Sequence, residues 1–239
     1  MKWIRTGYFI LTLSIVTILA VLISALVHLV SRFLLGRTDG RGVHFIASVW
    51  ARSLFALTPG WNIVTTGIEH IVQTEPYVIV SNHESMSDIW AMYALGMQFR
   101  WLSKAEVFRI PGVGSGMRWA GYVPVVRGDK DSHARAMAAA ANWIRRGVSM
   151  FFFPEGTRSK TGELLPFRPG AFKLAKAEGV RVLPVAIKGA KDLLPKGSIT
   201  PGSCTVSITV FAPIAIATGD EPEIIAGKVR EMIQNTLKA

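Results

Sequence analysis

The chain has 239 residues, of which half are hydrophobic, and its mean hydropathy is +0.34. This length suits one sizeable α/β domain with an additional segment and argues against two full domains. The net charge of +11 favours a polyanionic partner, such as nucleic acid, an anionic membrane face or a phosphorylated substrate. A single cysteine, Cys204, excludes an intramolecular disulfide and indicates a reducing compartment.

The first segment is apolar enough to enter a membrane. No Asp, Glu, Lys or Arg occurs between Arg5 and Arg32, and this interval is long enough to cross a bilayer. It exceeds the roughly 7–15 apolar residues of a signal peptide. No small-x-small cleavage site followed by the polar start of a mature protein occurs, so we expect the segment to be retained. Basic residues flank both ends, so the charge distribution gives no single orientation.

A second apolar stretch runs from Val43 to Leu57 at mostly helical spacing and stops at Thr58-Pro59. About fifteen residues are too few to cross a bilayer comfortably and suit the membrane interface better. Residues 1–58 therefore form either a membrane-embedded two-helix hairpin that anchors the protein to one leaflet, or a spanning anchor followed by a core helix. The sequence leaves both interpretations open.

From Trp61 onward, short β-branched or aromatic runs alternate with amphipathic stretches. This alternation predicts one α/β domain over residues 59–239, with a largely parallel central sheet flanked by helices. The expected strands are Asn62–Thr66, Tyr77–Ser81, Phe99–Ser103, Tyr122–Val126, Ser149–Phe153, Val182–Ile187 and Thr205–Phe211. The expected helices are Asp88–Leu95, Ser132–Arg146, Ala171–Ala177 and Glu221–Leu237.

His83 and Asp88 follow one of these strands at its carboxyl end, where open α/β sheets place their sites. Five residues of helix correspond to about 500° of rotation, so the two side chains can meet only if His83 lies in the turn and Asp88 in the first turn of a helix that Ser87 could cap. The carboxylate would then fix the imidazole tautomer and leave His83 as a general base. A histidine and an aspartate that merely stabilise a loop would show the same spacing.

A second polar segment, Phe-Pro-Glu-Gly-Thr-Arg-Ser, follows the strand that ends near Phe153. Gly156 permits an unusual turn or a close approach of a ligand, and Arg158 offers a planar fork for phosphate. Glu155 could accept a hydrogen bond from a hydroxyl group. A charged loop with an internal Glu155–Arg158 pair is the competing interpretation.

Four blocks in this order resemble the glycerolipid acyltransferase family, most closely its bacterial 1-acyl-sn-glycerol-3-phosphate acyltransferases. Asn82–Asp88 matches the family's Asn-His-x4-Asp block, and Phe153–Ser159 matches its Phe-Pro-Glu-Gly-Thr-Arg-Ser block without exception. Gly121–Arg127 fits a looser Gly-x5-Arg block, although Val126 replaces the polar residue often found before the Arg. Leu183–Ile187 fits an apolar-Pro-apolar strand. Four ordered blocks are a strong signal, although each alone is weak.

The resemblance implies transfer of an acyl group from acyl-CoA or acyl carrier protein to the sn-2 hydroxyl of lysophosphatidic acid, giving phosphatidic acid for phospholipid synthesis. A thiol leaving group, with a pKa of about 8.5, needs little help from an acid. His83 would act as the base and Asp88 would orient it. The resemblance also implies that several residues bind substrate: Glu155, Gly156, Thr157 and Arg158 at the glycerol phosphate, assisted by Arg127 and Lys104, and Pro184 beside the acyl channel.

The same resemblance implies the bacterial inner membrane as the location, with the catalytic domain facing the cytoplasm and the bilayer as a partner. We expect no cofactor beyond the acyl donor, which is a co-substrate. We also expect no metal, because no pair of His or Cys has zinc-like spacing. The absence of a Gly-x-Ser-x-Gly elbow argues against a hydrolase with an acyl-enzyme intermediate. The remaining histidines read as structural or surface residues: His28, His44, His70 and His133.

Other functions stay open on the sequence alone. The acceptor could be another lysophospholipid or a lyso-aminolipid, and acyl length, acyl saturation, donor carrier and oligomeric state are undetermined. A scaffold that binds anionic lipid without chemistry would also explain the charge. A nucleic-acid binder would explain it too, but the basic residues are interleaved with apolar strands and no recognition motif occurs, so we expect no nucleic-acid partner.

Overall fold

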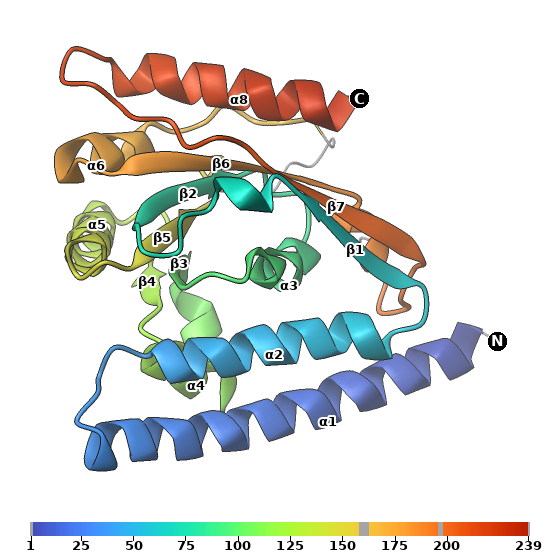
Figure 1. Cartoon of the computed structure of the whole chain (residues 1–239). Helices are drawn as coiled ribbons and strands as arrows, with labels where there is room; N and C mark the ends of the chain where they lie inside the picture. The colour runs from blue at the N-terminus through green and yellow to red at the C-terminus, as the bar shows by residue number, and fades with distance from the viewer. Residues whose placement is uncertain (1, 158–162, 196–197, 239) are drawn as a thin grey trace.

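The computed structural model describes residues 2–157, 163–195 and 198–238. The fold is a seven-stranded sheet in the order β1-β7-β6-β2-β5-β3-β4 with helices on both faces (Figure 1). All neighbouring strands are parallel except β6 and β7, which confirms the predicted α/β class with a largely parallel sheet. The strands are β1 (Trp61–Thr66), β2 (Tyr77–Ser81), β3 (Phe99–Lys104), β4 (Val123–Val125), β5 (Ser149–Phe152), β6 (Arg181–Lys188) and β7 (Cys204–Val210).

The central strands are buried on both faces, and their side chains alternate between two apolar cores. Every residue of β2 is buried: Tyr77 and Ile79 join one core, whereas Val78 and Val80 join the other. This is why β2 reads as an uninterrupted apolar run. The helices of the domain are α3 (Ser87–Met92), α4 (Val113–Trp119), α5 (Lys130–Arg145), α6 (Gly170–Glu178), α7 (Ala190–Leu193) and α8 (Pro222–Lys238).

The N-terminal segment forms the two predicted helices, α1 (Lys2–Leu29, extended by a π-helical turn over Val30–Leu34) and α2 (Arg41–Leu57). They lie side by side, with α2 between α1 and the domain (Figure 1). The inner face of α2 belongs to the core and includes His44, whose ring lies 3.0 Å from the Tyr122 hydroxyl and 3.3 Å from the Met97 carbonyl oxygen. The division of the chain between residues 58 and 59 stays a prediction.

Most of α1 is exposed. The stretch Lys2–Leu34 has a mean hydropathy of 2.8 in its most apolar window, of which 6% is buried, so by length and composition it could cross a membrane. Polar contacts nevertheless join α1 to α2 along its length. The Tyr8 hydroxyl donates to the Leu57 carbonyl oxygen over 2.9 Å, and the Trp50 indole donates to the Thr17 hydroxyl over 3.0 Å. Both helices therefore belong to one packed unit with the sheet.

Two predictions about helices are wrong. Ser87 does not cap α3, because α3 begins at Ser87 itself and the Ser85 hydroxyl accepts the Ser87 backbone N–H over 3.2 Å. The predicted helix Ser132–Arg146 begins two residues earlier, because the Asp129 side chain caps α5 by accepting the N–H groups of residues 131 and 132. Two short helices, α4 and α7, have too few apolar residues to show a helical period.

Candidate active site

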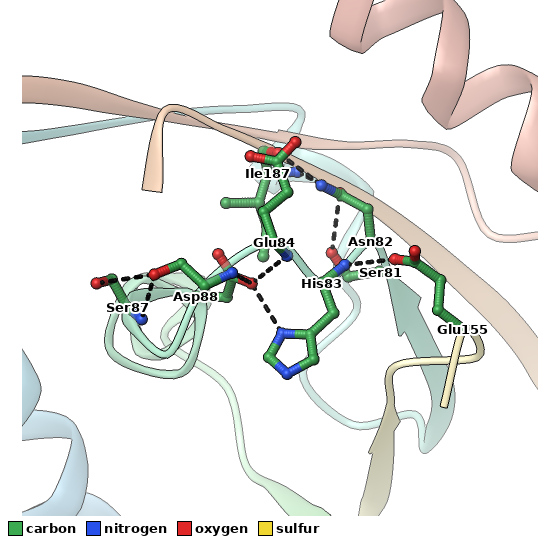
Figure 2. A network of polar contacts seen from close by, with 9 residues as sticks. Ser81, Asn82, His83, Glu84, Ser87, Asp88, Glu155 and Ile187 are labelled. Atoms are coloured by element: carbon green, nitrogen blue, oxygen red, sulfur yellow. Dashed lines mark hydrogen bonds and ion pairs between the residues drawn. The ribbon is translucent and has the colours of Figure 1, made fainter. Parts of the chain in front are cut away.

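The two blocks singled out in the sequence meet at one edge of the sheet. β2 and β5 are parallel neighbours, so the chain leaves both strands at the same edge. His83 lies two residues beyond β2, and Glu155 lies three residues beyond β5. Figure 2 shows their side chains converging with Asp88 from the start of α3. This is the carboxyl edge at which sites form in open α/β sheets.

His83 and Asp88 form a buried pair. The Nδ1 atom of His83 lies 2.8 Å from Oδ2 of Asp88, with His83 in the turn and Asp88 in the first turn of α3, which confirms the predicted geometry. The same carboxylate oxygen accepts the backbone N–H groups of Glu84 and Ser85, each over 2.8 Å. An ionised carboxylate only accepts hydrogen bonds, so the Nδ1 atom carries the proton and Nε2 is the basic nitrogen of the ring.

The imidazole ring is held in one orientation. Its plane stacks on the Phe153 ring at a centroid distance of 3.9 Å and an interplanar angle of 14°. His83 is 6% exposed, and Asp88 is fully buried. Within the described residues, Oδ1 of Asp88 makes no hydrogen bond, so Oδ2 carries the interactions of this carboxylate. The ring therefore presents Nε2 in a fixed direction, as a general base requires.

Glu155 joins the two blocks through the backbone. Its Oε1 accepts the His83 N–H over 2.7 Å, and its Oε2 accepts the Leu165 N–H over 3.0 Å. Burial raises the pKa of Glu155, these two hydrogen bonds lower it, and the nearby Asp88 raises it further. The sequence suggested a contact with a hydroxyl group or with Arg158, and it gave no sign of this link to the turn that carries His83.

Arg230 of α8 holds the segment that contacts Glu155, and no sequence pattern singled it out. Its guanidinium donates to the carbonyl oxygens of Leu164 and Leu165 over 2.6 and 3.0 Å. Leu165 in turn donates its N–H to Glu155. Arg230 lies 75 residues after Glu155 in the chain, so no local pattern connects them.

Asn82 anchors the turn to the sheet. Its side-chain Nδ2 donates to the Ile187 carbonyl oxygen, and its Oδ1 accepts the Ile187 N–H, both over 2.8 Å (Figure 2). Next to it, burial raises the pKa of Glu84, and the positive charge of Lys191 opposes this shift. Glu84 thus belongs with Asp88 and Glu155 to a group of three acidic side chains around the turn that carries His83.

Gly156 adopts a left-handed conformation, with φ of 70°, as predicted for an unusual turn. A Cβ atom at this position would lie 3.0 Å from the guanidinium carbon of Arg168, so this exposed arginine packs over the glycine. Arg168 belongs to neither sequence block, so no motif pointed to it. Thr157 is exposed beside it, and Arg158 lies outside the described residues.

The other predicted substrate-binding residues lie further along the sheet. Lys104 is the last residue of β3, and its side chain is 47% exposed. Its Nζ lies 3.2 Å from Oε1 of Glu106. Arg127 is exposed two residues after β4. The strand order β2-β5-β3-β4 places Lys104 two strands and Arg127 three strands from His83, at about 4.8 Å per strand. Pro184 is buried in β6 opposite Val80.

A hollow of about 10 Å³ lies beside His83 and is lined by Glu84, Glu155, Leu164 and Leu237, among others. It has room for about one water molecule. Across the described residues, no group of three or more His, Cys, Asp or Glu is arranged to hold a metal ion. The expected absence of a metal stays a prediction.

The chain belongs to the acyltransferase family, whose model matches residues 62–188 and so includes His83, Asp88 and Glu155. Its relatives include 1-acyl-sn-glycerol-3-phosphate acyltransferases. The chloroplastic enzymes BAT2 of Brassica napus and LPAT1 of Arabidopsis thaliana are 34% and 35% identical to it over 198 residues, which are 81% of this chain. The chain spans little more than half of their length, 56% and 54%.

A bacterial relative and a solved structure agree more fully in length. The 1-acyl-sn-glycerol-3-phosphate acyltransferase of Borreliella burgdorferi is 30% identical over 182 residues, which cover 75% of this chain and 73% of the relative. The crystal structure of the 1-acyl-sn-glycerophosphate (LPA) acyltransferase PlsC from Thermotoga maritima superposes with a TM-score of 0.82 at 25% identity. That match covers 100% of this chain and 97% of the other, so it includes the two N-terminal helices.

Proposed function

We propose that this protein transfers a fatty acyl group from a thioester donor to the sn-2 hydroxyl of lysophosphatidic acid, giving phosphatidic acid. The observation that supports this most is the buried His83–Asp88 pair, 2.8 Å apart, at the edge where the two family blocks meet. The acceptor is inferred from the relatives, which are 1-acyl-sn-glycerol-3-phosphate acyltransferases.

In the proposed reaction, Nε2 of His83 takes the proton of the acceptor hydroxyl as its oxygen attacks the thioester carbonyl carbon. The Asp88 carboxylate stabilises the imidazolium that forms. The C–S bond breaks when the tetrahedral intermediate collapses, and the thiolate leaves with the electron pair. The imidazolium then returns its proton to the thiolate or to solvent, which restores neutral His83. The donor is acyl-CoA or acyl carrier protein, and no further cofactor or metal takes part.

Basic residues at this edge suit a phosphate-bearing acceptor. We assign Arg158, Thr157 and the Gly156 turn to the glycerol phosphate, with Lys104 and Arg127 in support. Glu155 holds the turn of His83 through its backbone hydrogen bond. Pro184 and its neighbours in β6 would border the acyl chain.

We further propose that α1 lies in one leaflet of a bacterial inner membrane, with the domain on the cytoplasmic side. Two hydrogen bonds hold α1 against α2: Tyr8 donates to α2 near the start of α1, and Thr17 accepts from α2 near the middle of α1. The helix α2 is itself packed on the sheet. A helix held flat in this way leaves one apolar face for lipid. A lysolipid could then reach His83 with its chain still in the bilayer.

The test is an acyl-transfer assay with the full chain in detergent, using acyl-CoA and acyl carrier protein donors and a panel of lysolipids. We expect product with lysophosphatidic acid, and loss of at least about a thousandfold in kcat for His83→Ala, by analogy with other His–Asp catalysts. His133→Ala, which changes an exposed histidine of α5, is the matched control and should keep full activity.

Three results would contradict the proposal. Turnover retained by His83→Ala would exclude the mechanism. A preference for a lysolipid without a terminal phosphate would replace the acceptor while keeping the chemistry. A wild-type chain that binds anionic vesicles but transfers no acyl group to any acceptor would instead be a lipid-binding scaffold.

A further inference from the structure

A cleft of about 310 Å³ lies far from His83, where the turn between α1 and α2 meets the ends of α4 and α5. Five arginines line it: Arg32, Arg37, Arg41, Arg118 and Arg146. Three come from the N-terminal helices and their connection, one from α4 and one from the end of α5. The fold therefore brings like charges together from segments that are distant in the sequence.

The cleft has a strong excess of positive charge. Among its described lining residues the one carboxylate is Asp39, which lies 3.5 Å from the Arg41 guanidinium. Four arginines remain without a carboxylate of the cleft to balance them. Like charges gathered in a concave site repel one another, and an anion bound between them relieves this repulsion.

Aromatic rings hold the walls of the cleft in place. The Trp119 ring stacks on His28 at a centroid distance of 5.1 Å, which joins α4 to α1. The guanidinium carbon of Arg146 lies 4.5 Å from the centroid of the Trp143 ring, a cation–π geometry that orients this arginine. The site is thus built before any ligand arrives.

Arg100 adds a buried positive charge behind the cleft. Its guanidinium donates to the carbonyl oxygens of Asp39 and Phe99 over 2.6 and 2.8 Å, and its carbon lies 5.1 Å from the centroid of the Trp143 ring. Its Nε has no hydrogen-bond partner in the part of the chain that the structure describes. Burial lowers the pKa of Arg100 to about 10, so it stays charged at neutral pH.

The position of the cleft indicates a lipid rather than a soluble anion. It adjoins the end of the exposed apolar surface of α1, where Phe33, Leu34 and Leu35 are 75%, 77% and 58% exposed. Arg100 lies near the start of β3, whereas the site of His83 lies at the opposite, carboxyl edge of the sheet. A ligand of this cleft is therefore separate from the reacting substrate.

We infer that this cleft binds the phosphate headgroup of an anionic membrane lipid whose chains lie beside the end of α1. With 28 residues at about 1.5 Å each, α1 is about 42 Å long. A headgroup held at one end of it would fix how the protein is rotated on the membrane. The site of His83 would then face the bilayer in one orientation.

Flotation of the full chain with phosphatidylcholine vesicles, with and without phosphatidylglycerol, tests this site without using acyl transfer. The double variant Arg37→Gln/Arg146→Gln removes one charge from each side of the cleft. Each arginine near an anionic membrane surface contributes roughly fivefold to the affinity. Loss of two should therefore lower the affinity for anionic vesicles about 25-fold. The matched control Arg135→Gln/Lys228→Gln removes two exposed charges from α5 and α8 and should change the affinity less than about twofold.

Equal losses in the two double variants would assign the effect to diffuse surface charge and overturn the proposal. So would equal binding of the wild type to neutral and anionic vesicles. Displacement from vesicles by free CoA or inorganic phosphate, but not by sodium chloride of the same ionic strength, would assign the cleft to a soluble phosphate instead of a lipid.

Thermal unfolding of the purified protein in detergent shows whether the cleft variant is folded. If it melts early, Arg37→Gln alone, on the exposed turn, should still lose about fivefold in affinity. Because binding is measured without substrates, these outcomes do not depend on whether the chain transfers acyl groups.

Discussion

Nδ1 of His83 lies 2.8 Å from Oδ2 of Asp88, and this single oxygen also accepts two backbone N–H groups from the intervening turn. Asp88 therefore holds both the side chain of His83 and the loop that carries it. A change at Asp88 can affect the charge of the pair, the shape of the loop, or both.

Asp88→Asn separates these two effects. The asparagine side chain can still accept the backbone N–H groups, but it lacks the charge that stabilises an imidazolium. We expect kcat to fall by about 10³–10⁴ with little change in KM and with thermal unfolding close to wild type. Kinetics and melting curves on the same preparation check this, and a kcat within threefold of wild type would show that the charge of Asp88 does not contribute to catalysis.

Glu155→Ala should act through the backbone. It leaves the N–H groups of His83 and Leu165 without their acceptor, which costs about 1–3 kcal/mol for a buried donor. We expect a lower free energy of unfolding in denaturant titrations together with a lower kcat. Glu231→Ala, which removes an exposed carboxylate of α8, should leave both quantities unchanged. Similar results for the two variants would contradict the role assigned to Glu155.

Gly156 and Gly147 give a matched pair of glycines. Both have a positive φ, 70° and 73°, but a Cβ at Gly156 meets Arg168 whereas a Cβ at Gly147 has no atom within 4 Å. Alanine at either position should cost about 1–2 kcal/mol of stability from backbone strain. We expect kcat/KM to fall for Gly156→Ala alone, because only that change displaces the loop beside His83. Equal kcat/KM values would show that the Gly156 turn does not position substrate.

The buried ring of His44 predicts an acid-sensitive fold. Burial, with help from the charge of Arg100, lowers the pKa of His44 from 6.5 to about 3, so the unfolded chain binds the proton more readily than the folded one. Stability is therefore complete above about pH 6.5 and declines as the pH falls toward 3. Between pH 7.5 and pH 5 this amounts to about 2 kcal/mol.

Denaturant unfolding in detergent at the two pH values measures this loss, and His44→Gln provides the comparison. The variant should be less stable than wild type at pH 7.5 but should lose about 2 kcal/mol less on acidification. If wild type and variant lost the same amount, the acid sensitivity would arise elsewhere.

Local sequence patterns were sufficient to predict most strands of the sheet and the pairing of His83 with Asp88 at the centre of the site. The strands could be predicted because they are apolar runs bounded by turns, and the observed ends differ from the predicted ones by one residue at most. His83 and Asp88 could be paired because the geometry of one turn decides whether they meet. The short helices α4 and α7 could not be predicted, because neither has enough apolar residues to show a period.

Interactions between distant segments could not be predicted from these patterns. From the last helix, Arg230 reaches the carbonyl oxygens of Leu164 and Leu165 next to Glu155. The cleft beside Trp143 assembles its arginines from the helices α1, α2, α4 and α5 and from the connection between α1 and α2. A solvated arginine and an arginine in such a site look alike in the sequence. Three-dimensional packing alone distinguishes them.

The two hydrogen bonds between Asn82 and Ile187 have a consequence for the Asn-His-x4-Asp block itself. A side-chain amide offers the same donor and acceptor as a peptide group, so Asn82 continues the ladder between β2 and β6 while its own backbone turns away. Aspartate cannot donate and leucine can do neither. The asparagine of the block thus works as a substitute peptide bond, which frees the next residue, the histidine, to leave the sheet and face the substrate.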